Sequence, residues 1–360
     1  MIIKRLQLNN FRNYEELDIE FSKGVNLLYG DNAQGKTNIL EAVFMLATTK
    51  SIRGSKDREM IRFGEEEAHI CAYVERNDFS HKIDIHLKKN KAKGLAIDGI
   101  PIRKSTELLG LMHAVSFSPE DLSMMKNGPE ERRRFIDLEL CQLNKIYCSD
   151  LINYNKTLMQ RNDLLKQISV KPALKDTIEV WDEQLVRFGS RIIEARRLFI
   201  DELIPIVKEK HSILTDGKEE LSISYEPNTT KQDMAAKLRS SLDKDLAMKF
   251  TTCGPHRDDM LLFINGNNVR IYGSQGQQRT VALALKLSEI ELVRNKIKEP
   301  PLLLLDDVLS ELDRNRQLQL LNEMKDVQTI VTCTGMEEFI QCRPEGNTIF
   351  RVSNNGATLV

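Results

Sequence analysis

A glycine-rich segment followed by lysine and threonine has the composition needed to bind the phosphates of a nucleotide. It follows an apolar run at 25–29, precedes a helix-periodic run at 38–46, and reads Gly30-Asp31-Asn32-Ala33-Gln34-Gly35-Lys36-Thr37. Backbone N–H groups of such a loop can converge on phosphate oxygens, and the following helix adds its positive end. We therefore predict a P-loop in which Lys36 binds the outer phosphates and Thr37 ligates Mg²⁺. The alternative is a glycine-rich turn that arose by chance.

Two aspartates, Asp306 and Asp307, end an apolar run at 302–305. Ligands of open α/β sheets collect at the C-terminal ends of the strands. We expect Asp306 to hold Mg²⁺, directly or through water, and Asp307 to position or deprotonate an attacking water. Asp307 and Lys36 are then the candidate catalytic residues for ATP hydrolysis. The alternative is a strand that runs into a polar turn with solvated acids.

A second loop of small residues, at 272–279, also precedes a predicted helix. Its candidate phosphate-binding residues are Ser274, Gly276 and Gln277, because a small loop at a helix N-terminus binds anions. One ATP does not need two such loops from one subunit, so we expect this loop to close on the ATP of a second copy. A further polar segment, 310–313, predicts a capping box, with Ser310 as N-cap and Asp313 at N3 of a helix at 314–324.

The elements that must position these loops follow an α/β pattern. Strands are predicted at 2–8, 17–21, 25–29, 81–87, 94–99, 260–264, 302–305 and 329–332, and helices at 38–46, 277–293 and 314–324. The region between 69 and 97 is predicted to be antiparallel sheet with a turn at Asp98-Gly99, and 119–249 to be mostly helical. We predict an α/β fold interrupted by a helical insertion, with parts at 1–118, 119–249 and 250–360.

Composition narrows the classes of function. The chain has 360 residues, enough for two or three domains, and 52 Lys and Arg against 53 Asp and Glu. Any contact with DNA must therefore come from local basic patches, and its strength should fall with salt. The six cysteines lack C-x-x-C spacing, so zinc and disulfide frameworks are unsupported. Without a signal core or an apolar run of about 20 residues, we expect a cytoplasmic protein that does not span a membrane.

The order of the motifs resembles an ABC-type ATPase head. The four segments around Lys36, Ser274, Asp306 and Asp313 resemble, in this order, the Walker A, signature, Walker B and D-loop motifs. Within that superfamily the whole chain is similar to the RecF family of recombination-repair proteins. The similar stretches are L-x-L-x-N-F-R-N-Y at 6–14, S-F-S-P-E-D-L at 116–122, E-R-R-R-F-I-D at 131–137 and C-G-P-H-R-D-D at 253–259.

This resemblance implies an ATPase head made of 1–118 and 250–360, with a short helical arm at 119–249. It implies two ATPs sandwiched in a head-to-tail homodimer, with Arg12 and Asn13 near the nucleotide. It also implies gapped, duplex and single-stranded DNA as partners, together with RecR and RecO, in the loading of a recombinase. The expected activity is a weak, DNA-stimulated ATPase, since Asp307 stands where transporters usually have Glu.

Other positions depart from the wider ABC pattern or leave alternatives open. Ser118–Asp121 stands where a Gln is usual and also reads as a helix cap, and Thr332 and Thr334 stand where the switch His is usual. The basic clusters either track DNA phosphates or form a solvated surface; they are Lys50, Arg53 and Lys56; Lys88, Lys89, Lys91 and Lys93; Arg132, Arg133 and Arg134; Arg196 and Arg197. His256 is expected to be a hydrogen-bonded joint rather than a catalyst, and Trp181 a core residue. The other classes of function are a transporter-type ATPase subunit and a scaffold that does not hydrolyse its nucleotide.

Overall fold

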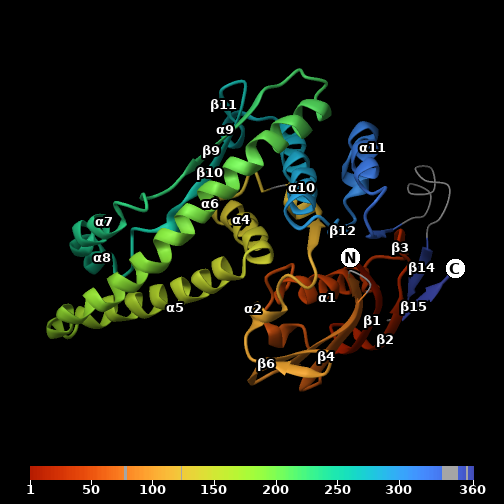
Figure 1. The fold of residues 1–360 in the computed structure, drawn as a ribbon, viewed down its shortest axis with the longest axis horizontal. Coiled ribbons are helices and arrows are strands. Elements are labelled where there is room, and N and C mark those ends of the chain that lie inside the picture. The colour runs from red at the N-terminus through yellow and green to blue at the C-terminus, as the bar shows by residue number, and fades with distance from the viewer. Residues whose placement is uncertain (77–78, 123, 335–347, 354–355) are drawn as a thin grey trace. The chain divides into compact units, whose positions relative to one another are not determined.

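The chain folds into two compact units in a computed structural model. The structure describes residues 1–76, 79–122, 124–334, 348–353 and 356–360. Unit 1 consists of Met1–Ser123 and Ala282–Val360, and unit 2 is Met124–Val281. The mixture of sheets and helices confirms the predicted α/β class (Figure 1). The three-part division into domains stays a prediction.

The mainly parallel sheet of unit 1 has the strand order β15-β14-β3-β13-β12-β8. All but β15 run parallel. Both faces of a parallel sheet are usually covered, so its strands are nearly continuous apolar runs. Three of these strands were predicted from such runs, at 25–29, 302–305 and 329–332. The patterns did not predict β14 and β15. The strands are β3 (Val25–Tyr29), β8 (Ala114–Phe117), β12 (Leu302–Asp306), β13 (Thr329–Cys333), β14 (Thr348–Ser353) and β15 (Gly356–Leu359).

The second sheet of unit 1 is antiparallel, with the strand order β2-β1-β4-β5-β6-β7. The predicted turn at Asp98-Gly99 joins β6 to β7, and both residues have the positive φ (53° and 77°) of a type I′ hairpin turn. The antiparallel sheet is thereby confirmed. Its strands are β1 (Ile2–Phe11), β2 (Tyr14–Glu20), β4 (Glu67–Arg76), β5 (Phe79–Lys88), β6 (Lys91–Ile97) and β7 (Ile100–Ile102).

Helix α1 (Lys36–Thr48) follows β3 and packs on β8, β12 and β13. The other described helices of unit 1 are α2 (Ser105–Leu108), α3 (Pro119–Leu122) and α11 (Arg314–Glu323), with 3₁₀ turns at Asp57–Glu59 and Leu309–Glu311. Helix α10 (Gln275–Ile297) begins in unit 2 and ends in unit 1. The capping box predicted for α11 is wrong. Asp313 is itself the N-cap and accepts from the Arg316 backbone at 3.1 Å, because the 3₁₀ turn at Leu309–Glu311 occupies the preceding residues. Ser310 Oγ instead donates to the Asp307 carbonyl at 2.8 Å.

Unit 2 is built around two long helices, α5 (Lys145–Ile168) and α6 (Ile178–Leu214), which lie side by side (Figure 1). Asn144 caps α5 by accepting from two backbone N–H groups of its first turn. The partly buried Trp181 packs against the buried cluster Leu164, Leu165, Ile168 and Ile178, which agrees with its expected core role. The shorter helices are α4 (Pro129–Leu143), α7 (Met234–Ser240), α8 (Leu242–Met248) and α9 (Val269–Tyr272), with 3₁₀ turns at Pro172–Thr177 and Pro255–Arg257.

Unit 2 also contains a small antiparallel sheet, with the order β11-β10-β9. Its strands are β9 (Leu221–Glu226), β10 (Asp259–Ile264) and β11 (Asn267–Asn268). The segment 119–249 is mostly helical, as expected, but β9 within it was not predicted. This strand alternates, and its pairing with β10, for instance Ile223 opposite Leu262, decides its conformation.

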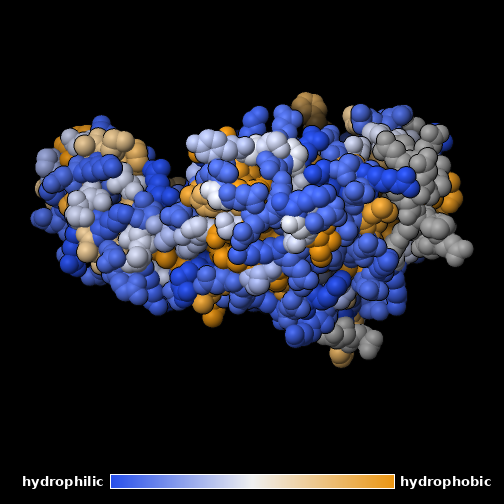
Figure 2. All heavy atoms as spheres, turned by 90° about the horizontal axis from the view of Figure 1, so that it is seen from above, coloured by the Kyte–Doolittle hydropathy of each residue, from blue (hydrophilic) through white to orange (hydrophobic). Residues whose placement is uncertain are grey.

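The face of the molecule drawn in Figure 2 is mainly hydrophilic, with hydrophobic side chains in small separate groups. Within the described ranges, no helix combines the length and the hydropathy that crossing a bilayer requires.

Candidate nucleotide site

The loop at 30–37 joins the buried strand β3 to the N-terminus of α1, as a P-loop does. Only glycine fits at its two ends. A Cβ on Gly30 would lie 2.3 Å from the backbone oxygen of Val352 on β14. A Cβ on Gly35 would lie 2.5 Å from Asn13 Nδ2 and 2.7 Å from the Tyr14 hydroxyl, and Gly35 has a φ of 104°. The path of the loop is therefore set by β14 on one side and by the β1–β2 hairpin on the other.

Lys36 places a buried positive charge inside this loop. Its side chain donates to the backbone carbonyls of Gly30 (2.6 Å) and Asp31 (3.0 Å), and the residue is 4% exposed. Among the described residues no carboxylate lies within ion-pair distance of this ammonium group. A buried charge is costly without a counter-charge, so an anion held by the loop would complete the site. A nucleotide phosphate fits this requirement.

The Asp306 carboxylate lies at the end of β12 and is hydrogen-bonded by two hydroxyl groups. Thr37 Oγ1 and Thr332 Oγ1 each donate to Asp306 Oδ1 at 2.8 Å. Burial raises the pKa of Asp306, and these two hydrogen bonds oppose the rise. A hydroxyl beside a carboxylate at the mouth of a P-loop is a suitable set of hard oxygen ligands for Mg²⁺. Asp307 follows in a left-handed conformation, with a φ of 50°.

Arg12 and Asn13 stand in the turn between β1 and β2, and they make different contacts. Asn13 Nδ2 donates to the Gln34 carbonyl at 3.3 Å, and Asn13 Oδ1 accepts from Asn38 at 2.6 Å. Asn13 therefore touches the P-loop directly. The Arg12 guanidinium instead forms a bidentate ion pair with Glu41 of α1, at 2.7 and 2.8 Å. Their roles toward a nucleotide stay predictions.

The second predicted loop belongs to unit 2, where it forms the N-terminus of α10. Ser274 and Gln277 form a capping box: Ser274 N donates to Gln277 Oε1 at 2.9 Å, and Gln277 N donates to Ser274 Oγ at 3.2 Å. The helix begins at Gln275, two residues earlier than expected. Ser274 and Gly276 are exposed. A long helix thus presents its positive end to a surface on which an anion can bind.

Known proteins match this chain over nearly all its length. The family model described as RecF/RecN/SMC N terminal domain matches residues 2–358. The DNA replication and repair protein RecF of Lachnoclostridium phytofermentans is 60% identical over 352 residues, which cover 98% of either chain. The chain belongs to the RecF family.

Two solved RecF structures have the same fold. A structure of the recombination mediator protein RecF with ATPrS, in the RecFOR pathway, has a TM-score of 0.92 at 36% identity and covers 100% of this chain and 98% of its own. A second, RecF with ATP, has a TM-score of 0.92 at 37% identity and covers 99% of this chain and 97% of its own. These matches confirm the predicted ABC-type P-loop ATPase head and the predicted family.

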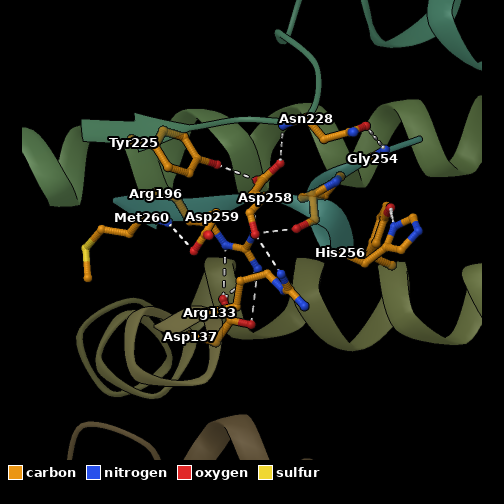
Figure 3. Close-up of polar contacts among 12 residues, drawn as sticks. Arg133, Asp137, Arg196, Tyr225, Asn228, Gly254, His256, Asp258, Asp259 and Met260 are labelled. Atoms are coloured by element: carbon orange, nitrogen blue, oxygen red, sulfur yellow. Dashed lines mark hydrogen bonds and ion pairs between the residues drawn. The ribbon is translucent and has the colours of Figure 1, made fainter. Parts of the chain in front are cut away.

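In this RecF-family chain, two of the basic clusters each contain one arginine that is not a surface cation. Arg132 is 2% exposed and forms a bidentate ion pair with Asp259. Arg196 is likewise buried, between Asp137 and Asp258 (Figure 3). The idea that these two arginines track DNA phosphates or form a solvated surface is therefore wrong, because each is buried and forms ion pairs with acids of unit 2.

The remaining clusters are at the surface. Lys50, Arg53 and Lys56 are exposed. Lys88 of β5 pairs with Glu67 of β4, and Lys89 pairs with Glu66 just beyond the ends of these strands, at 2.8 Å each. Exposed pairs of this kind are weak, so a polyanion can compete for their lysines.

His256 is hydrogen-bonded on both ring nitrogens, as expected. Nε2 lies 3.0 Å from the Thr251 carbonyl and Nδ1 lies 2.7 Å from the Tyr154 hydroxyl. Burial lowers the pKa of His256 to about 4, so the ring is neutral near pH 7. Because a carbonyl only accepts, Nε2 carries the proton and Nδ1 accepts from Tyr154. The ring therefore connects α5 to the segment at 251–257 within unit 2.

Sequence reasoning missed the role of Glu41, which is 0% exposed and is hydrogen-bonded to Arg12 and Ser51. One acid in the otherwise apolar run NILEAVFML was the available signal, since a buried carboxylate needs a partner. Ser118 and Asp121, whose role was open, form the hydrogen-bonded start of α3 at 2.8 and 3.1 Å.

Proposed function

We propose that this RecF-family protein is an ATP-dependent DNA-binding protein of recombinational repair that dimerises when it binds ATP. It acts in the cytoplasm, binds gapped or single-strand/duplex junction DNA, and helps to load a recombinase together with RecR and RecO. Slow ATP hydrolysis, stimulated by DNA, releases it. The observation that carries the proposal is the buried Lys36 ammonium beside the Thr37–Asp306 pair, because its partners within the described part of the chain are two backbone carbonyls and no carboxylate.

The roles of the P-loop side follow from these contacts. Lys36 exchanges the carbonyls of Gly30 and Asp31 for the outer phosphates, and the loop 30–37 surrounds the phosphates with backbone N–H groups. Thr37 and Asp306 supply oxygen ligands for Mg²⁺, which neutralises phosphate charge when bound. Asp307 orients or deprotonates the attacking water, and its short side chain makes this step slow.

The second half of the site comes from another copy of the chain. Ser274, Gly276 and Gln277 are placed at an exposed helix N-terminus, which favours the charge of a γ-phosphate. Closure of this loop over the ATP of a partner would bury the phosphate and couple dimerisation to the nucleotide state. The dimer would then dissociate after hydrolysis because the γ-phosphate contact is lost.

DNA binding must come from local charge, because the chain as a whole carries a net charge of −1. The candidate phosphate contacts are the exposed residues Lys50, Arg53 and Lys56, together with Lys88 and Lys89. Such contacts give affinity without base readout, which suits a protein that binds a DNA structure rather than a sequence.

The central test is the size of the protein in solution with and without ATP and Mg²⁺. We expect a monomer without ATP and a dimer with it. Lys36→Met should lose ATP binding, whereas Ser274→Arg should bind ATP and fail to dimerise. Ser240→Arg, which adds the same charge at an exposed serine of α7, is the control and should dimerise normally. Normal dimerisation of Ser274→Arg would refute the assignment of this loop to the partner's nucleotide.

A second measurement addresses DNA. ATP turnover is compared without DNA and with gapped, duplex or single-stranded DNA at two salt concentrations. We expect the greatest stimulation with gapped DNA and its loss at high salt. Equal turnover under all these conditions would refute the proposed coupling of hydrolysis to DNA.

A further inference from the structure

Thr332 stands between the two strands that deliver the P-loop and the acidic pair. Its strand, β13, pairs with β3 on one side and with β12 on the other. In the register of these parallel strands Thr332 is directly beside Asp306 and opposite Leu28, next to the end of β3. Since β-branched side chains have restricted χ1 rotamers and this residue is 1% exposed, its hydroxyl is held in one direction.

The hydrogen bonds of Thr332 have only one consistent set of directions. The Asp307 backbone N–H lies 2.9 Å from Thr332 Oγ1 and is a donor, so the hydroxyl oxygen accepts there. The single hydroxyl proton is then left for Asp306 Oδ1, at 2.8 Å. One hydroxyl thus connects the carboxylate of the first acid to the main chain of the second.

The two acids need this connection for different reasons. Asp306 receives both of its hydroxyl contacts, from Thr37 and Thr332, on Oδ1. In the described part of the chain its Oδ2 accepts no hydrogen bond. Asp307 has a φ of 50°, which a residue with a Cβ adopts only where the surroundings hold it. The contact from its N–H to Thr332 is one of the interactions that hold it.

We infer that Thr332 is a positioning residue for the two acids. Its hydroxyl turns Asp306 so that Oδ2 is available to a Mg²⁺ ion or a water bound to it, and it anchors the left-handed turn from which the Asp307 side chain projects. Thr37 cannot replace it, because Thr37 belongs to the P-loop and its own oxygen is a candidate Mg²⁺ ligand. This inference rests on the proposed binding of ATP and Mg²⁺.

The test uses three variants on one strand. Thr332→Val keeps the branched shape and removes the hydroxyl, and Thr332→Ser keeps the hydroxyl and removes the methyl group. Thr329→Val is the matched control: Thr329 is also buried in β13, at 0% exposure, but its hydroxyl donates to the Val327 carbonyl at the other end of the strand. The affinity of each protein for a fluorescent ATP analogue is measured by anisotropy in EDTA and again in Mg²⁺, and thermal unfolding checks the fold.

In the wild-type protein and in Thr329→Val we expect Mg²⁺ to tighten binding of the analogue. In Thr332→Val the affinity in EDTA should stay within about twofold of wild type, and the gain from Mg²⁺ should fall by about tenfold, which is about 1.4 kcal/mol. Thr332→Ser should recover most of the gain. ATP turnover should show the same pattern, mainly in kcat rather than in KM.

Two results would overturn the inference. In one, Thr332→Val keeps the full gain from Mg²⁺, as Thr329→Val does. In the other, Thr332→Ser loses as much as Thr332→Val, so that packing and not the hydroxyl matters. Should Thr332→Val not fold, Thr332→Ala takes its place. Failure of the wild-type protein itself to bind the analogue would instead refute the proposed function.

Discussion

Replacing Arg196 with Met should destabilise unit 2 far more than the same change at its neighbour Arg197. The Arg196 guanidinium is 3% exposed and binds Asp137 at 2.9 Å and Asp258 at 3.0 Å. It also donates to the Pro255 carbonyl at 2.7 Å and to the Tyr147 hydroxyl at 3.1 Å. Figure 3 shows the two acids on either side of this side chain. Arg197, in contrast, is half-exposed and pairs with Glu194 and Asp201 on the surface of α6.

The expected magnitude follows from the acid that is left behind. Asp258 is 1% exposed, and without Arg196 its remaining partners are the hydroxyl of Tyr225 and the backbone N–H of Asn228. Removing one partner of a buried ion pair costs about 3–5 kcal/mol, because the other charge stays buried. With a urea m-value of roughly 2 kcal/mol/M, the midpoint of unfolding should fall by about 2 M. Arg197→Met should leave the midpoint nearly unchanged, because exposed ion pairs contribute little.

The chain offers a local probe for this measurement. Trp181 is its only tryptophan and packs in unit 2 against the cluster around Leu165. Urea unfolding followed by tryptophan fluorescence therefore reports on unit 2. Arg196→Lys, which keeps the charge but not the planar fork of donors, should fall between wild type and Arg196→Met. Equal midpoints for Arg196→Met and Arg197→Met would refute the view that Arg196 is a structural ion-pair partner.

Two further predictions concern the P-loop and His256. Gly30→Ala should weaken binding of the ATP analogue by at least about tenfold, because the added Cβ would lie 2.3 Å from a backbone oxygen of β14. The control is Gly94→Ala, which should bind the analogue normally because its added Cβ would meet only an ordinary contact at 3.6 Å. Between pH 7.5 and pH 4, His256 alone should lower the free energy of unfolding of unit 2 by about 3 kcal/mol. In this pH range the unfolded chain, whose ring has a pKa of 6.5, binds a proton, whereas the folded ring has a pKa of about 4 and stays largely neutral. This part of the loss should be absent in His256→Gln. Urea unfolding midpoints of both proteins, measured across this pH range, test the prediction, and midpoints that fall in parallel would contradict it.

Local sequence signals determined the elements that carry the candidate site. The loop at 30–37 was predictable because a glycine at each end, a lysine and a threonine at fixed spacing have few uses other than phosphate binding. The apolar run at 302–305 predicted a buried strand, and the two acids after it predicted polar groups at the edge of the sheet. Helix α10 was predicted at 277–293, directly after a loop of small residues.

Tertiary structure decided which polar residue serves which role. Arg132 and Arg196 read as surface cations in the sequence, but their acids, Asp259 and Asp258, come from a segment more than 60 residues further along the chain. The strand at Leu221–Glu226 exists because β10 pairs with it, and Thr332 meets Asp306 because β13 and β12 are neighbours in the sheet. Spacing along a chain describes neighbours within a turn or a strand, whereas burial and ion pairing depend on residues that only folding brings together.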